Sequence, residues 1–198
     1  MSNIGLPLLY ALLLWWFSTG VILYLDSLPR RTFRWSLAGA SVLTVAALYA
    51  LVRSSEMVSA VGAYIAFTAG VLVWGWLEMS YFMGLITGPW QSPCPPSVHG
   101  WRRFVLAIRT SLYHECAIVL TGGMMLWFTR EQPNALAAWT FVVLWLMRWS
   151  SKLNVFLGVP NLNEDFLPEQ LSYLKSFMPH RPMNLLFPVS ITAATVVT

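Results

Sequence analysis

The chain is short of charged residues for its length. Lys, Arg, Asp and Glu make up 10% of its 198 residues, whereas a soluble domain carries about a quarter. Hydrophobic residues make up 57%, and the mean hydropathy is +0.61. This combination indicates an integral membrane protein and argues against an ordinary soluble domain. The net charge of +4 is therefore interpreted through membrane topology rather than nucleic-acid binding.

Motifs that would demand catalysis are also lacking. Cys94 and Cys116 are the only cysteines, which excludes a disulfide framework and a Cys-ligated metal site. The chain has three histidines in all, too few for a histidine-box oxygenase, and it lacks the paired Glu-x-x-His signature of di-iron bundles. A Gly-rich phosphate loop and a nucleophile motif are absent too. We therefore expect a protein that is not an enzyme.

Long apolar runs are what the sequence does contain. A helix needs about 20 apolar residues to cross the hydrocarbon layer, and five runs qualify: about 4–25, 33–52, 57–87, 104–128 and 135–157. A sixth run, 184–198, is short and has no polar flank, so we expect the chain to stop inside its last helix. The sequence predicts an all-α polytopic transmembrane helix bundle with six spans, forming a single membrane domain over residues 1–198.

Basic residues are distributed unevenly between the loops. Loops 1, 3 and 5 carry most of them, namely Arg30, Arg31, Arg34, Arg102, Arg103, Lys175 and Arg181. Loops 2 and 4 carry Arg53 and Arg130. Because Lys and Arg mark the cytoplasmic side, the N-terminus is predicted to be periplasmic and loops 1, 3 and 5 cytoplasmic.

Loop 5, residues 158–183, is the most polar of these segments. Gly158 and Pro160 are predicted to end the fifth span. Apolar residues then follow at helical spacing after the candidate N-cap Asn163, which predicts a short amphipathic helix on the membrane surface or on a partner. This expected docking helix comprises Asn163, Glu164, Asp165, Phe166, Leu167, Leu171, Tyr173, Leu174 and Phe177.

Several ionisable residues fall inside the predicted spans, where they are costly and usually face the bundle interior. They are Glu78, His114, Glu115, Arg148 and Lys152. The two acids and two bases are predicted to form a buried salt-bridge network. His114 and Glu115 are adjacent, so their side chains point about 100° apart around the helix. We expect them to address two neighbouring helices.

Specific strings suggest a family. "WWFSTGVILYLDSLPRRTFR", "YHE", "SKLNVFLGVPNLNEDFLPEQLSYLKSF" and "RPMNLLFPVS" resemble the PuhE-type photosynthetic complex assembly proteins of purple bacteria, and the resemblance covers essentially the whole chain. The genes of these proteins lie near that of the reaction-centre H subunit. The family has no motif with assigned chemistry, so the resemblance implies a role without a mechanism.

The implied role is assembly of the reaction centre and light-harvesting 1 complex. The protein would be a multi-pass protein of the inner membrane, in its photosynthetic or intracytoplasmic part. It would dock on nascent subunits, either as a transient factor or as a permanent accessory subunit, and the sequence leaves both open.

His114 is the residue with the most alternatives. It is interpreted first as a hydrogen-bonded core histidine. In the context of the resemblance it is also a candidate axial ligand for bacteriochlorophyll, which would make the protein a pigment binder or a pigment-delivery protein. A third reading is an intramembrane, metal-dependent pigment-modifying enzyme, with the metal held by His114 and the acids Glu115, Glu164, Asp165 and Glu169. Those last three acids are more simply a solvated helix start.

Overall fold

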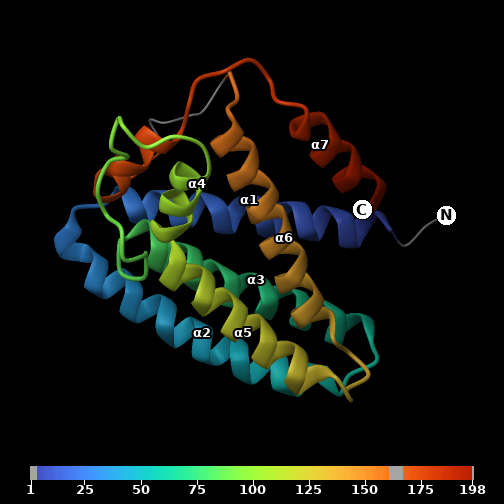
Figure 1. The fold of residues 1–198 in the computed structure, drawn as a ribbon. Coiled ribbons are helices and arrows are strands. Elements are labelled where there is room, and N and C mark those ends of the chain that lie inside the picture. The colour runs from blue at the N-terminus through green and yellow to red at the C-terminus, as the bar shows by residue number, and fades with distance from the viewer. Residues whose placement is uncertain (1–3, 161–166, 198) are drawn as a thin grey trace.

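The computed structural model describes residues 4–160 and 167–197 (Figure 1). Within these residues the regular structure is helical, apart from an isolated bridge between Val159 and His180. The elements are α1 (Gly5–Ser27), η1 (Arg30–Thr32), α2 (Phe33–Ser55), α3 (Ala60–Phe82), α4 (Gly100–Arg109), α5 (Leu112–Thr129), α6 (Leu136–Leu157), η3 (Glu169–Phe177) and α7 (Leu186–Val197).

Three helical segments of the described chain are long and apolar enough to cross a membrane: Gly5–Ser27, Arg30–Ser55 and Ala60–Phe82. A fourth is added if α4 and α5 count as one bent span. Helix α6, which carries Arg148 and Lys152, is also long but is not one of these segments. The protein is thus all-helical, with three to four candidate membrane spans.

Helix α3 is the central helix, because it packs against α1, α2, α5 and α6. In its most apolar stretch 44% of the residues are buried, against 0% in α1 and 11% in α2. The main core forms around α3, where Trp74 meets Phe141 of α6 edge to face at 5.3 Å. Polar contacts fix the outer helices on it: Tyr10 of α1 bonds Thr68 at 2.6 Å, and the Trp76 indole donates to Ser41 of α2 at 2.9 Å.

The predicted fourth span, 104–128, is wrong in one respect, because the helix is broken. Helices α4 and α5 meet at Thr110–Ser111 with a bend of 62°. The loop before α4 packs into this break. A Cβ at Gly88 would clash with the backbone of Arg109 and Thr110, so only glycine fits there. The expected third span, 57–87, is also too long, since α3 ends at Phe82.

Apart from the C-terminal end of α6 and from α7, most helix ends lie in two groups (Figure 1). At one end, loop 3 contacts η3 through the Cys94 N–H, which donates to Ser176 Oγ at 2.8 Å. At the other end, the Asn134 side-chain amide, between α5 and α6, donates to the carbonyls of Ser54 and Met57, at 3.0 Å and 3.3 Å. Loops 3 and 5 therefore lie together, and loops 2 and 4 lie together.

The helix end predicted at Gly158 is confirmed. Helix α6 ends at Leu157, and Gly158 follows with a positive φ of 108° that favours glycine. Its carbonyl accepts from the Asn184 side chain at 2.9 Å. Asn154 of α6 also donates to Ser190 of α7 at 3.1 Å, so these polar contacts hold α7 against the end of α6.

Candidate functional site

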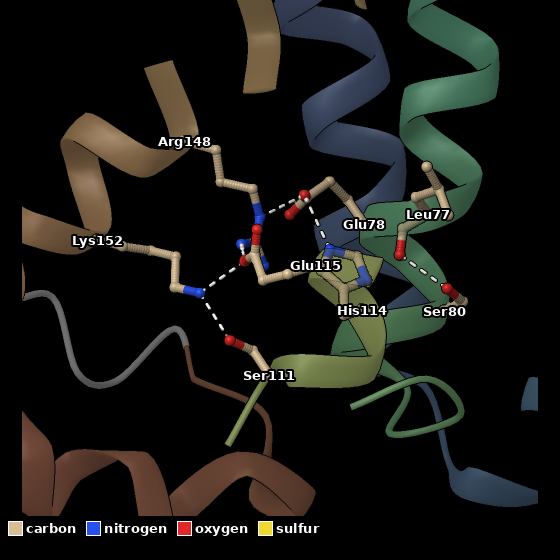
Figure 2. Close-up of polar contacts among 8 residues, drawn as sticks. All are labelled: Leu77, Glu78, Ser80, Ser111, His114, Glu115, Arg148 and Lys152. Atoms are coloured by element: carbon tan, nitrogen blue, oxygen red, sulfur yellow. Dashed lines mark hydrogen bonds and ion pairs between the residues drawn. The ribbon is translucent and has the colours of Figure 1, made fainter. Parts of the chain in front are cut away.

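An ionic cluster joins α3, α5 and α6 inside the protein (Figure 2). Arg148 of α6 donates from Nε to Oε1 of Glu78 at 2.6 Å and from Nη1 to Oε1 of Glu115 at 2.7 Å. The three side chains are only 9–15% exposed. One guanidinium therefore links carboxylates from two different helices, and its planar array of donors suits that task.

Lys152 completes the cluster one turn further along α6. Its Nζ donates to Oε1 of Glu115 and to Oγ of Ser111, each at 2.7 Å. Its side chain is 31% exposed, more than twice as much as that of Arg148. Two cations face two carboxylates, so the cluster is balanced in charge.

The break between α4 and α5 determines the positions of Ser111, His114 and Glu115. Because α5 begins at Leu112, Ser111 stands at its N-cap and Glu115 lies in its first turn. A carboxylate is stabilised there by the positive end of the helix dipole. The backbone N–H of His114 lies in the first turn of α5 and has no partner within the helix. It donates to the carbonyl of Thr87 in loop 3 at 3.0 Å.

His114 is fully buried, at 0% exposure. Its Nε2 lies 3.5 Å from Oε1 of Glu78, and its ring centroid lies 4.7 Å from that of Tyr81. His114 therefore faces α3, while Glu115 faces α6. It does not line the neighbouring cavity. A chlorin ring could reach Nε2 only if Glu78 and Tyr81 moved away, so these residues do not fit an axial-ligand site.

The described acids of the metal hypothesis, Glu115 and Glu169, do not form a metal site with His114. No group of three or more His, Cys, Asp and Glu side chains in the described part of the chain is placed to hold a metal ion. Glu169 is exposed on η3. Glu164 and Asp165 lie outside the described residues, as do Asn163 and Phe166.

The expected docking helix differs from its prediction. Glu169–Phe177 is a 3-10 helix, and its apolar side chains are turned into the protein. Leu171, Leu174 and Phe177 are spaced three apart, the spacing that a 3-10 helix aligns on one face. Leu171 and Leu174 pack with Tyr81, and Leu167 and Tyr173 lie against the same cluster. Leu171 and Leu174 therefore anchor loop 5 to α3 and do not form an exposed apolar face, while the docking role of the segment stays a prediction.

Three residues near the cluster are not among the sequence-predicted site residues. Ser111 precedes Glu115 by one turn, and Tyr81 follows Glu78 by three residues, with the Arg148 guanidinium 5.0 Å from its ring centroid. Helical spacing from the charged residues could have identified both. Asp26, near the end of α1, is 7% exposed, and neither carboxylate oxygen has a hydrogen-bond partner among the described residues.

The geometry defines a class: an all-helical protein of membrane type whose helices are joined by a buried, charge-balanced ionic cluster. The chain belongs to the family described as protein of unknown function (DUF3623), which matches residues 1–198. It is 38% identical to a protein of Rhodobacter capsulatus, over all of this chain and 74% of that protein. That relative is described as an uncharacterized 30.4 kDa protein in the puhA 5′ region. No solved structure matches the chain.

Proposed function

We propose that this protein is an assembly factor for the reaction centre and light-harvesting 1 complex, and that it docks on nascent subunits in the inner membrane. The observation that carries the proposal is the location of the Rhodobacter capsulatus relative in the puhA 5′ region, which fits a photosynthesis operon. The resemblance of the sequence to photosynthetic assembly proteins supports the same role.

The structure suggests which surface docks. Apart from Asp26, α1 buries no residue, although it is the first of the apolar spans. Trp16 and Phe17 are 77% and 68% exposed. Aromatic side chains of this size are common anchors of protein interfaces. We therefore assign the exposed face of α1 to the membrane helices of the partner subunits. The polar face of η3, with exposed Lys175, is available to their cytoplasmic parts.

The proposal includes a topology of six crossings with the N-terminus in the periplasm. The grouping of loops 3 and 5 at one end and loops 2 and 4 at the other supports an alternating path. Loop 1 joins the first group, because Pro29 and Arg30 line the same cavity as Pro168 and Glu169. Helix α4 would then lie in the membrane interface, since it is bent away from α5 and carries Arg102 and Arg103 beside an exposed Trp101.

Affinity purification tests the proposal. The full chain, tagged and expressed at native level in a purple bacterium, is purified in mild detergent during induction of the photosynthetic apparatus. We expect reaction-centre or light-harvesting 1 subunits to co-purify, and a deletion strain to accumulate fewer complete core complexes. The control is a tagged polytopic protein of similar abundance and unrelated function.

A pair of variants tests the assigned face. Trp16→Leu on α1 should reduce co-purification, whereas Trp35→Leu on α2, where the side chain is 70% exposed, should not. Both variants remain apolar, so insertion is preserved. Absence of every core subunit from the wild-type preparation, together with normal core complexes in the deletion strain, contradicts the assembly role.

A further inference from the structure

A cavity of about 600 Å³ lies between α1, α3, α6 and η3. Its walls are mostly apolar and include Trp15, Ile22, Trp74, Leu144 and Phe177. This volume falls within the range of small-molecule sites, about 300–1,000 Å³. At one wall stand Arg148 and Lys152, whose charges are already balanced by Glu78 and Glu115. The cavity therefore suits a hydrocarbon group rather than a second anion.

A smaller cavity of about 430 Å³ adjoins it, lined by the end of α1, by η1 and by the start of η3. Leu23, Phe82 and Leu167 line both cavities. The smaller one is the more polar of the two. Asp26 lines it, and its two buried carboxylate oxygens have no hydrogen-bond partner among the described residues. Arg30 and Glu169, both exposed, line the same cavity.

An unpartnered buried carboxylate is unfavourable, so its retention beside a cavity points to a ligand that donates to it. A primary ammonium group has three N–H donors and the opposite charge. Arg30 supplies a cation at the same cavity, where it can bind a phosphate. A group that carries both an ammonium and a phosphate satisfies both residues at once.

We propose that the two cavities together bind one zwitterionic phospholipid with a primary ammonium head group, of the phosphatidylethanolamine class. The ammonium donates to Asp26, the phosphate is bound by Arg30, and an acyl chain occupies the apolar cavity beside Trp74 and Ile22. This inference does not depend on the proposed assembly role.

Lipid titration of the delipidated full chain, followed by native mass spectrometry, tests the proposal. The probes are dioleoyl phosphatidylethanolamine, phosphatidylcholine and phosphatidylglycerol. We expect phosphatidylethanolamine to bind about tenfold more tightly than phosphatidylcholine, whose quaternary ammonium cannot donate a hydrogen bond. Equal affinity for these two lipids, or a preference for phosphatidylglycerol, overturns the proposal.

Two polar variants separate the parts of the head-group site. Asp26→Asn should abolish the preference for phosphatidylethanolamine over phosphatidylcholine, and it should fold, since it removes an unpartnered buried charge. Arg30→Gln, at an exposed position, should weaken the binding of both lipids and leave the ratio of their affinities unchanged. Glu131→Gln and Arg53→Gln, on exposed residues at the other end of the bundle, are the matched controls. A preference that survives in Asp26→Asn overturns the assignment.

Gly75→Leu tests the apolar cavity. A Cβ at Gly75 meets only Ile22 Cδ1, at an ordinary contact distance of 3.5 Å, and Gly75 lines the larger cavity, so a leucine there should fill space that the acyl chain needs. We expect it to weaken binding of all diacyl lipids at least fivefold. Gly39→Leu, where nothing lies within 4 Å of the new Cβ, is the control. Unchanged lipid binding by Gly75→Leu contradicts the placement of the chain.

Discussion

Arg148 and Lys152 lie on the same face of α6, but they bond to different partners. Arg148 bonds to both carboxylates of the cluster, whereas the hydrogen bonds of Lys152 within the described residues go to Glu115 and Ser111. Lys152 is also nearly a third exposed, so its charge keeps part of its hydration. Loss of Arg148 leaves two buried carboxylates with a single cation between them, while loss of Lys152 leaves both carboxylates bonded to Arg148.

The first prediction ranks these residues by how much their substitution lowers the stability of the protein. Arg148→Leu should lower the unfolding free energy by about 3–5 kcal/mol, the cost of breaking a buried ion pair from one side. Lys152→Met should cost clearly less. Lys175→Leu, on the exposed face of η3, should stay within about 0.5 kcal/mol of wild type. Reversible unfolding of the purified variants in detergent gives the values, and equal stabilities would show that the cluster contributes nothing.

A second residue-scale prediction concerns the coupling between Arg148 and Glu78. Glu78→Gln removes the negative charge and keeps the shape, so it should destabilise the wild type. In an Arg148→Leu background the same change should cost less or even stabilise, because it removes a carboxylate that has lost its guanidinium partner. The double-mutant cycle measures this difference. Additive effects would mean that the 2.6 Å contact carries no pairwise energy.

For single residues, the sequence identifies the charged members of the cluster better than it identifies the uncharged or isolated residues beside them. Four charged residues in apolar runs had to face one another, since lipid offers them no solvation. Ser111 and Asp26 carry no such signal. Ser111 joins the cluster only because the helix breaks beside it, and the isolation of Asp26 depends on where η1 and η3 place their side chains. Contacts of that kind come from tertiary packing and not from local pattern.

Helices α3 and α6 approach each other closely where they cross at Gly70. At Gly70 an added Cβ would lie 2.7 Å from the carbonyl oxygen of Ala137 and 3.2 Å from Thr140 Cβ. Small residues allow this approach, which is the usual basis of close packing between membrane helices. The backbone carbonyl cannot move aside without moving α6.

The third prediction follows from this crossing. Gly70→Leu should force α3 and α6 apart and destabilise the protein by at least about 1–3 kcal/mol, the usual cost of overpacking. Because Arg148 reaches Glu78 across the same pair of helices, the ionic cluster should open as well. Thermal unfolding compared with Gly39→Leu on the open face of α2 checks it. Equal midpoints for the two variants would contradict the close approach.

A fourth prediction concerns η3. Leu171 is 1% exposed and packs with Tyr81 and Leu174. Leu171→Ala should cost about 2–5 kcal/mol if the whole segment is anchored cooperatively, and it should release loop 5 to added protease. Ser172→Ala, at the exposed neighbouring position, should leave cleavage unchanged. Identical proteolysis of both variants would show that η3 is not held by this side chain.

Elements were predictable to different degrees. Long apolar runs located α1, α2 and α6 to within a few residues, because the membrane requires such lengths. The apolar run 104–128 does not predict the break at Thr110–Ser111, because that break depends on a contact with Gly88, which is distant in the sequence. The spacing of Leu171, Leu174 and Phe177 fits both an α-helix and a 3-10 helix, so pattern alone could not decide between exposure to a partner and anchoring on α3.

For the whole molecule, the separation of its two ends bears on the proposed function. Loops 1, 3 and 5 gather at one end, and loops 2 and 4 at the other. The ionic cluster, the two cavities and η3 all lie toward the first end, which carries most of the basic loop residues. If that end is cytoplasmic, the partner subunits proposed above would meet these polar surfaces on the cytoplasmic side of the membrane.

Cysteine labelling tests this orientation with few changes, because Cys94 and Cys116 are the only native thiols. In a Cys94→Ser, Cys116→Ser background, single cysteines are placed at exposed positions of the two ends: Glu56 and Glu131 at one, Ser97 and Ser172 at the other. A membrane-impermeant maleimide added to intact cells should label only Glu56→Cys and Glu131→Cys. The other pair should react only after permeabilisation.

The reverse pattern would invert the orientation and keep the bundle, whereas mixed labelling within one end would contradict the alternating path itself. The two kinds of failure are distinct because the grouping of loops rests on contacts in the structure, while the side of the membrane rests on the distribution of Lys and Arg.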